Sequence, residues 1–150
     1  MTVKKKARAG PSGVYTHELE YPMRKELDLA DITAGVTKAV QKSGFINGTA
    51  TVFVPGATGA VTCLEYEPGV IADFKEALER AAPRAGQYEH NRYQADGNGH
   101  SHVRAGLIGP SLAIPFVDGQ LTLGVWQQVT LVNFDNRGRR RRVIVQVVGA

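Results

Sequence analysis

The sequence predicts a single α+β domain in which two main helices pack on a largely antiparallel or mixed β-sheet. The chain of 150 residues has the usual size of one domain. Most segments alternate apolar and polar residues with the period of a β-strand, and only two show the period of a helix. A single cysteine, Cys63, excludes an internal disulfide and a cysteine-rich zinc site, and we interpret it as a small buried hydrophobe rather than a nucleophile.

The positive charge is concentrated in two short segments. The formal net charge is +4, of which residues 1–10 contribute +4 and residues 137–142 contribute +5, leaving −5 on the rest. Residues 1–13 are predicted to be a flexible basic leader before a domain that spans 14–150. No apolar run approaches the roughly 20 residues of a membrane-spanning helix, and Gly10-Pro11-Ser12-Gly13 replaces the apolar stretch of a secretory signal. We therefore expect a cytoplasmic protein without a membrane partner.

The first helix is predicted immediately after two short strands. Asp31 or Thr33 can cap a helix that runs to about Ser43, because its apolar positions fall on one face and Gly44 stands where a C-terminal stop belongs. Before this helix, a period-two alternation predicts strands over residues 14–21 and 24–29, joined at Tyr21-Pro22-Met23.

The middle of the chain predicts two strands and the second helix. β-Branched residues favour a strand over 46–54, which Pro55-Gly56 ends, and a further strand follows over 61–66. Pro68 then opens a helix that runs to about Ala82 and presents one apolar stripe, and Pro83 ends it.

The last third begins with a polar segment and ends with strands. From Gln87 to Gly109 the periodicity is lost, which predicts a long polar loop of the kind that is often functional. Strands are then predicted over 111–117, 120–123, 126–134 and 142–148, with Asp118-Gly119 as a hairpin turn. The final strand is apolar on both faces, so we expect it to lie between layers or in a subunit contact.

The polar segment contains three of the four histidines, His90, His100 and His102. In an extended chain His100 and His102 would share one face, a spacing that can serve a metal or an anion. Imidazole titrates near neutral pH and can act as an acid, a base or a ligand. The alternative is that these are surface histidines without a role.

Three further groups could carry chemistry. Glu65 and Glu67 alternate with apolar residues along one strand face, where a buried carboxylate would be costly, unless the strand emerges into solvent there. The small residues from Pro55 to Ala60 would let backbone N–H groups approach an anion, although they match neither a P-loop nor a dinucleotide fingerprint. The arginines of residues 137–142 offer forked donors suited to phosphate, or form a solvated turn.

A nucleic-acid partner is not favoured, despite the basic net charge. The sequence has no aromatic-plus-basic RNA motif, no helix-turn-helix and no glycine-rich RNA clamp. Outside the two basic segments the chain is acidic. The charge is therefore better matched to a small anion than to a polymer.

A set of short motifs occurs in a fixed order along the chain: Gly44-Phe45, Val52-Phe53-Val54, Tyr88-Glu89-His90-Asn91, Asn98-Gly99-His100-Ser101-His102, Gly109-Pro110-Ser111 and the stretch from Gly119 to Gln128. In this order they resemble the YjbQ family, a group named for thiamine-phosphate synthase-like activity. The similarity spans about residues 14–149, and the stretch from Ser111 to Gln127 is its most specific part.

The resemblance implies a compact α+β domain that assembles as a homotrimer, with a polar pocket near the subunit contacts. It implies catalytic roles for four residues, Glu65, His90, Asn98 and His102. The candidates for binding substrate or phosphate are Thr58, Gly59, Trp126, Gln127 and Arg140. Asp73 matches a less diagnostic position.

The expected activity is that of a thiamine-phosphate synthase-like transferase acting on a small phosphorylated ligand. His90 and His102 are the candidate ligands of a divalent metal, Mg²⁺ or Zn²⁺. The chain departs from the family in one place, because Gly56-Ala57-Thr58 stands where many members carry His-Thr-Thr. Unless His100 substitutes, this chain lacks that imidazole.

Two other functions remain open at this point. A metal-dependent hydrolase could use the same histidines and glutamate. A non-enzymatic trimer could bind phosphate or RNA through its arginines and leader.

Overall fold

The computed structural model describes residues 11–150, so the predicted leader lies almost wholly outside the described residues. Eight strands and four helices follow one another in the order β1 (Gly13–Met23), β2 (Asp28–Asp31), α1 (Thr33–Ser43), β3 (Gly48–Phe53), β4 (Gly59–Leu64), α2 (Pro68–Ala81), α3 (His90–Tyr93), α4 (Gly99–Ile108), β5 (Ser111–Val117), β6 (Gln120–Leu121), β7 (Gln128–Asn133) and β8 (Arg139–Gly149). The predicted α+β class is confirmed. Within the described residues, no helix is both long and apolar enough to span a lipid bilayer.

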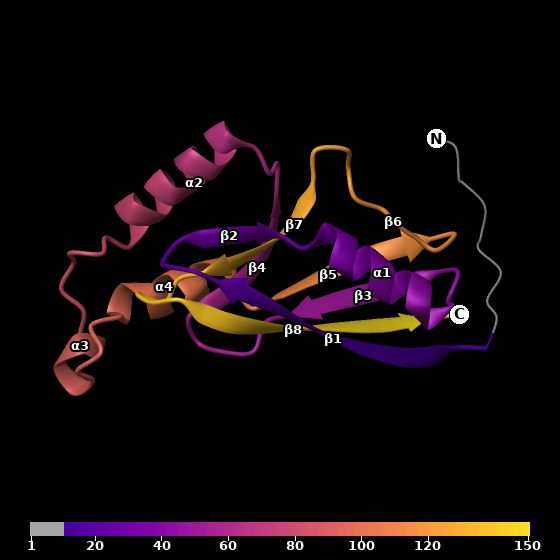
Figure 1. The fold of residues 1–150 in the computed structure, drawn as a ribbon, viewed down its shortest axis with the longest axis horizontal. Helices are drawn as coiled ribbons and strands as arrows, with labels where there is room; N and C mark the ends of the chain where they lie inside the picture. Colours follow the sequence, from indigo (N-terminus) through magenta and orange to yellow (C-terminus); the bar gives the residue numbers. More distant parts are fainter. Residues whose placement is uncertain (1–10) are drawn as a thin grey trace.

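The strands form two antiparallel sheets. The larger sheet has the order β1-β8-β3-β5-β6 and the smaller one has the order β2-β7-β4. Figure 1 shows α3 and α4 at one end of the molecule, with the C-terminus at the other end and α1 lying along the sheets. The end that carries α3 and α4 holds most of the polar residues singled out by the sequence.

Two hydrophobic cores lie on opposite sides of β7. The first packs α1 and the inner face of the larger sheet against Val129 and Leu131 of β7. The second packs α2 and α4 against Val132 and Phe134, with Leu78 as the buried residue of α2. The smaller sheet is therefore the middle layer, and β7 is buried on both faces.

The strand expected to be apolar on both faces is β8, and the structure buries only one of them. Val143, Val145 and Val147 are fully buried, whereas Val148 on the other face is 47% exposed. The expectation that β8 lies between layers is thus wrong, because β7 occupies that place. The alternative, that its outer face makes a subunit contact, stays a prediction.

The two strands predicted before α1 differ from the structure. β1 continues through Pro22 to Met23, and the next strand, β2, is shorter and belongs to the other sheet. Pro22 does not end β1 because β1 is an edge strand, where a residue without an N–H group can leave its outer side unpaired. The turn between the strands places Leu27 at a φ of 52°.

The predicted loop from Gln87 to Gly109 contains two helices, α3 and α4. Glycine, histidine and serine are weak helix formers, so the sequence of α4 carries little local signal. Tertiary contacts stabilise α4 instead: Ala105 is buried in the second core and Arg104 is fully buried. The prediction of a loop was wrong because helical stability here comes from packing rather than propensity.

A pair of glycine substitutions tests two helix assignments. Gly44 ends α1 at a φ of 73° and Gly106 lies inside α4, and an added Cβ would meet no atom within 4 Å at either position. We expect Gly44→Ala to lower the free energy of unfolding by about 1–2 kcal/mol, because alanine is strained in the left-handed region. Gly106→Ala should raise it by roughly 0.5–1 kcal/mol, through helix propensity. Urea unfolding followed by circular dichroism measures both; shifts of the same sign would contradict the assignments.

Candidate functional site

His90 and His102 lie in direct contact at the end of the molecule formed by α3 and α4. Their ring centroids are 4.4 Å apart and the ring planes are inclined by 43°. Both side chains are half-buried. His90 Nε2 lies 3.4 Å from Asp96 Oδ1, within ion-pair distance, but makes no hydrogen bond with the described residues. The structure thus brings together two residues that lie twelve positions apart in the sequence.

Asn98 lies at the N-terminus of α4, between the two histidines in sequence. It is 5% exposed, and its Oδ1 atom is buried without a hydrogen-bond partner among the described residues. The neighbouring Gly99 N–H donates to Asn91 Oδ1 at 2.9 Å, which fixes the start of the helix against α3. Three of the four predicted catalytic residues therefore belong to one region.

His100 does not share a face with His102, contrary to expectation. Because α4 is helical, residues two apart point about 200° from each other, and His100 is buried in the interior. Its Nε2 lies 2.9 Å from Glu26 Oε1, which also accepts a hydrogen bond from Arg104 at 3.1 Å. Arg104 pairs in addition with Glu79 of α2. This cluster anchors α4 to α2 and to the turn before β2, so we assign His100 a structural role.

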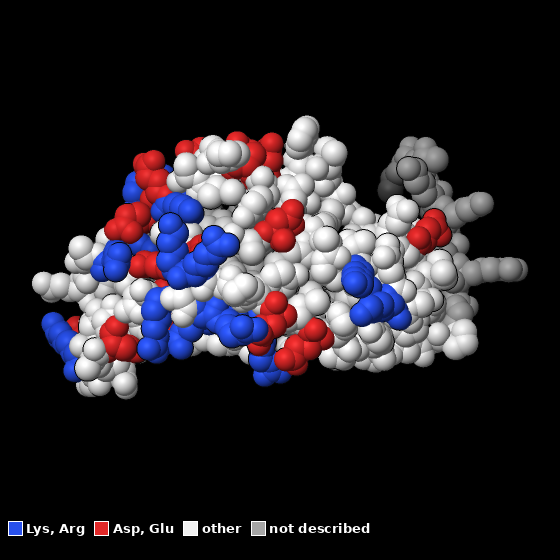
Figure 2. Space-filling model, in the orientation of Figure 1, with Lys and Arg blue, Asp and Glu red and all other residues white. Residues whose placement is uncertain are grey.

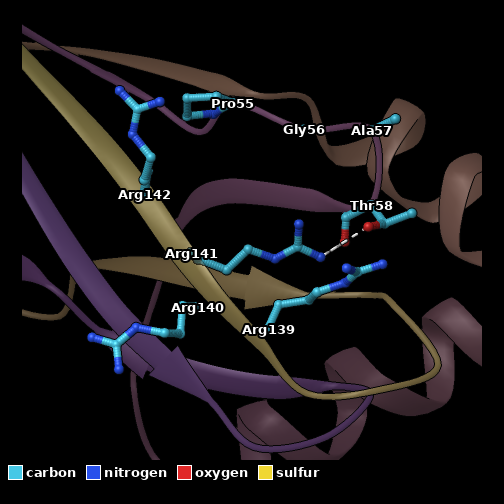
Figure 3. Close-up of a pocket in the computed structure, with 8 residues that line it drawn as sticks. All are labelled: Pro55, Gly56, Ala57, Thr58, Arg139, Arg140, Arg141 and Arg142. Carbon is cyan, nitrogen blue, oxygen red and sulfur yellow. Dashed lines mark hydrogen bonds between the residues drawn. The ribbon is translucent and has the colours of Figure 1, made fainter.

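A basic depression, which we call the arginine hollow, lies beside the loop between β3 and β4 (Figure 3). It has a volume of about 510 Å³ and is lined by Pro55, Gly56, Ala57, Thr58 and the four residues from Arg139 to Arg142. The figure shows Arg141 and Arg139 directed toward Thr58, and Arg140 directed away from it.

Arg141 is the buried member of this group. Its Nε donates to Asn133 Oδ1 at 3.0 Å, and its Nη2 donates to the carbonyl and the hydroxyl of Thr58 at 2.8 and 2.9 Å. Burial lowers the pKa of the Arg141 guanidinium, with Asp135 opposing and Arg139 adding to this effect. Thr58 holds this guanidinium, and the missing side chain at the adjacent Gly59 leaves room for it, since a Cβ there would lie 3.3 Å from its Cζ.

The other three arginines are paired with carboxylates. Arg139 Nε donates to Asp135 Oδ2 at 2.7 Å, while Arg140 and Arg142 pair with Glu20 and Glu18 of β1 on the outer face of the sheet. Arg140, predicted to bind phosphate, is therefore directed away from the Thr58 loop and is already neutralised. The reason is strand alternation, which turns Arg140 outward and Arg141 inward.

The arginine hollow and the histidine pair are connected through the turn between β7 and β8. Asn136 of this turn donates to the backbone carbonyl of Asp96 at 2.8 Å. Asp135, the preceding residue, accepts a hydrogen bond from Thr58 Oγ1 at 3.2 Å. This short turn thus contacts both Asp96, which lies beside His90, and Thr58, which lies beside Arg141.

Glu65, Trp126 and Gln127 lie elsewhere in the described chain. Glu65 follows the end of β4 and is exposed, as the solvent alternative predicted. Together with Trp126 it lines a separate depression of about 290 Å³, and Trp126 is 68% exposed. Gln127 Oε1 accepts a hydrogen bond from the Gly124 N–H at 2.8 Å, which closes the loop before β7. Within one chain these residues do not line the arginine hollow.

The residues that sequence reasoning missed are Arg141, Asn133 and Asp135. A signal for Arg141 was present, because it shares its strand face with Val143, Val145 and Val147. Asn133 and Asp135 carried no comparable signal, since their roles depend on the turn that follows β7.

The sequence matches a family model described as UPF0047 protein YjbQ-like over residues 17–150. The chain belongs to the YjbQ family. A UPF0047 protein of Methanothermobacter thermautotrophicus is 36% identical over 136 residues, covering 91% of this chain and 93% of the relative. A UPF0047 protein of Archaeoglobus fulgidus is 34% identical, covering 87% and 99%.

Solved structures of YjbQ-like proteins share the fold. The crystal structure of a YbjQ-like protein of unknown function from Sulfolobus solfataricus has a TM-score of 0.89 at 29% identity, covering 93% of this chain and all of that one. An uncharacterized YjbQ/UPF0047 family protein from Clostridium acetobutylicum has a TM-score of 0.80 at 34% identity, covering 87% and 98%. The recognition made from the motifs is confirmed.

The carboxylate of Asp135 gives the site a measurable dependence on pH. Its burial opposes ionisation, but Arg139, Thr58 and Arg141 together outweigh burial and hold the pKa of Asp135 below its usual value. A lowered pKa stabilises the folded state above the unfolded pKa, and this stabilisation is lost as the pH falls through the folded pKa. We expect Asp135→Asn to lower the free energy of unfolding by about 1.5–3 kcal/mol at pH 7.

The difference from the unsubstituted protein should shrink as the pH is lowered from about 5 toward 2. Urea titrations at several pH values measure it. Asp73→Asn is the matched control, because Asp73 is exposed on α2 and makes no hydrogen bond with the described residues. A difference for Asp135→Asn that stays constant with pH would show that the loss is steric rather than electrostatic.

Proposed function

We propose that this YjbQ-family protein is a cytoplasmic thiamine-phosphate synthase-like transferase that acts on small phosphorylated substrates. One observation carries the proposal: the His90–His102 pair and the arginine hollow are connected through the turn between β7 and β8. Histidines that share a turn with a positively charged depression suit a reaction in which phosphate charge develops as a bond breaks.

The reaction has simple requirements. The ring nitrogen of a thiazole phosphate attacks the methylene carbon of a pyrimidine diphosphate ester. A C–N bond forms, the C–O bond breaks, and pyrophosphate leaves with the electron pair. Because negative charge collects on the leaving group, the site needs fixed positive charge and hydrogen-bond donors more than a strong nucleophile. Arg141 would supply charge, and His90 or His102 in the protonated form would donate a hydrogen bond to the departing oxygen.

A resident metal fits the described residues poorly. Residues 11–150 contain no group of three or more His, Cys, Asp or Glu side chains placed to hold one ion. His90 and His102 would supply two ligands, whereas a catalytic zinc site usually has three protein ligands. Mg²⁺ accompanies a diphosphate substrate and needs only one or two carboxylates from the protein, so it belongs in the assay as part of the substrate.

The activity can be tested with purified protein, both substrates and Mg²⁺, with thiamine phosphate as the measured product. We expect His102→Ala to lower kcat by roughly 100-fold or more, the usual contribution of an acid or base. His17→Ala is the matched control, because this histidine stacks on Tyr15 of β1 in a different part of the fold. No product above the His102→Ala level would refute the assignment.

We also propose that the chain forms a homotrimer through the outer face of the larger sheet. The strand register places four exposed apolar side chains on this face: Val14, Phe53, Val117 and Val148. The helix α1 packs on the opposite, inner face. Exposed apolar side chains gathered on one face of a sheet are a common basis for a protein contact.

Sedimentation velocity tests the assembly. We expect a mass about three times 16.2 kDa, and dissociation on Phe53→Asp, because a carboxylate would be buried without a partner. Tyr93→Asp is the control, since Tyr93 is an equally large apolar residue, 82% exposed on α3. A stable monomer at working concentration would contradict the trimer.

A further inference from the structure

We propose that Arg141 is the anion receptor of this domain, and that its Nη1 binds the phosphate group of a small phosphomonoester through an opening beside Gly56. This inference deepens the proposed function by naming the group that holds the substrate phosphate. It stands on the charge and geometry of the arginine hollow, so it can hold even if the transferase assignment fails.

Arg141 carries a buried positive charge. The residue is 6% exposed, and no carboxylate of the described residues lies within the 4.0 Å that would make an ion pair. Each neighbouring arginine has its own carboxylate: Asp135, Glu20 or Glu18. A buried charge is ordinarily paired because desolvation is expensive. Arg141 is the cation in this strand segment without a carboxylate at ion-pair distance, and Asp135, which acts on it electrostatically from farther away, is itself paired with Arg139.

Neutral groups hold the guanidinium of Arg141 in place. Its hydrogen-bond acceptors are the amide oxygen of Asn133 and the carbonyl and hydroxyl oxygens of Thr58. All three are neutral, so they fix the orientation of Arg141 without cancelling its charge. The contacts occupy Nε and Nη2, and Nη1 makes no hydrogen bond with the described residues. An anion site requires a donor that is held in a fixed orientation and still has N–H groups without a hydrogen-bond partner.

Gly56 provides access to the guanidinium of Arg141. Gly56 is exposed and has a φ of +124°, and a Cβ placed on it would lie 3.3 Å from Arg141 Nη1. Any other residue would be strained there and would crowd the free nitrogen. The loop therefore approaches the guanidinium closely while leaving Nη1 uncovered toward the arginine hollow.

The ligand class follows from the donors and the surroundings. Arg139 lies beside Arg141 but is paired with Asp135, so the free Nη1 of Arg141, which points toward Gly56, is the donor left for a phosphate oxygen. A nucleic-acid strand would need a continuous basic track. Figure 2 instead shows blue and red side chains intermixed at the end of the molecule that carries the helices. A small phosphomonoester fits these features better than a polymer.

The test measures binding of glycerol 3-phosphate and of inorganic phosphate by isothermal titration calorimetry, with glycerol as the uncharged comparison. We expect Arg141→Gln and Gly56→Ala each to weaken phosphate binding about tenfold or more, the loss typical of one charged hydrogen bond. Arg140→Gln removes the arginine that the sequence favoured and should change affinity less than about twofold. Arg80→Gln, on exposed α2, controls for the loss of one positive charge.

Folding and function are separated by two further measurements. Circular dichroism checks each variant; if Arg141→Gln does not fold, Gly56→Ala decides, because it keeps the guanidinium and closes the opening. His102→Ala should retain phosphate binding while losing turnover. Phosphate binding that depends on Arg141, in a protein that makes no thiamine phosphate, would support the receptor and reject only the transferase.

Three results would overturn the proposal. Unchanged affinity in folded Arg141→Gln or Gly56→Ala would show that Nη1 does not bind the ligand. A loss in Arg140→Gln as large as that in Arg141→Gln would indicate a diffuse surface effect. If single-stranded RNA binds more tightly than glycerol 3-phosphate, and binds the Arg141→Gln variant as tightly as the unsubstituted protein, the ligand is a nucleic acid that binds a different surface.

Discussion

The side chain of Asn133 is the contact on which the arrangement of the site depends. Its amide nitrogen donates to the backbone carbonyls of Lys25, Asp135 and Arg137, while its oxygen accepts hydrogen bonds from Arg141. One fully buried amide at the end of β7 therefore ties together the turn before β2, the turn before β8 and the guanidinium of Arg141. A carboxylate at this place would face three carbonyl oxygens and would neutralise Arg141. A neutral residue with both donors and acceptors is required.

The sequence predicted the fold well where packing and local pattern agree. The helices α1 and α2 end within about a residue of the expected positions because each has an apolar stripe and a clear stop signal, Gly44 or Pro83. The turn at Asp118-Gly119 was predictable because both residues adopt positive φ, which these residue types tolerate. α4 was not predictable, since the interactions that hold Arg104 and His100 come from α2 and from the turn before β2.

The site was only partly predictable for a related reason. His90, Asn98 and His102 could be named from the sequence, but their proximity depends on a helix that has little intrinsic propensity. The arginines from 139 to 142 look equivalent in the sequence, yet the structure gives them different partners according to the face of β8 on which each lies. Assigning a role to one of them required the neighbours on β1 and β7, which no local pattern specifies.

The pairing of Arg140 and Arg142 with glutamates of β1 has a consequence for aggregation. β1 is an edge strand of 11 residues, long enough to template the addition of a strand from another chain. Charged side chains on an edge disfavour such addition, and Pro22 removes one N–H donor from the row. The half of β1 nearest the turn is therefore protected against open-ended strand stacking, so the same arginine run that borders the arginine hollow also limits fibril growth from this edge.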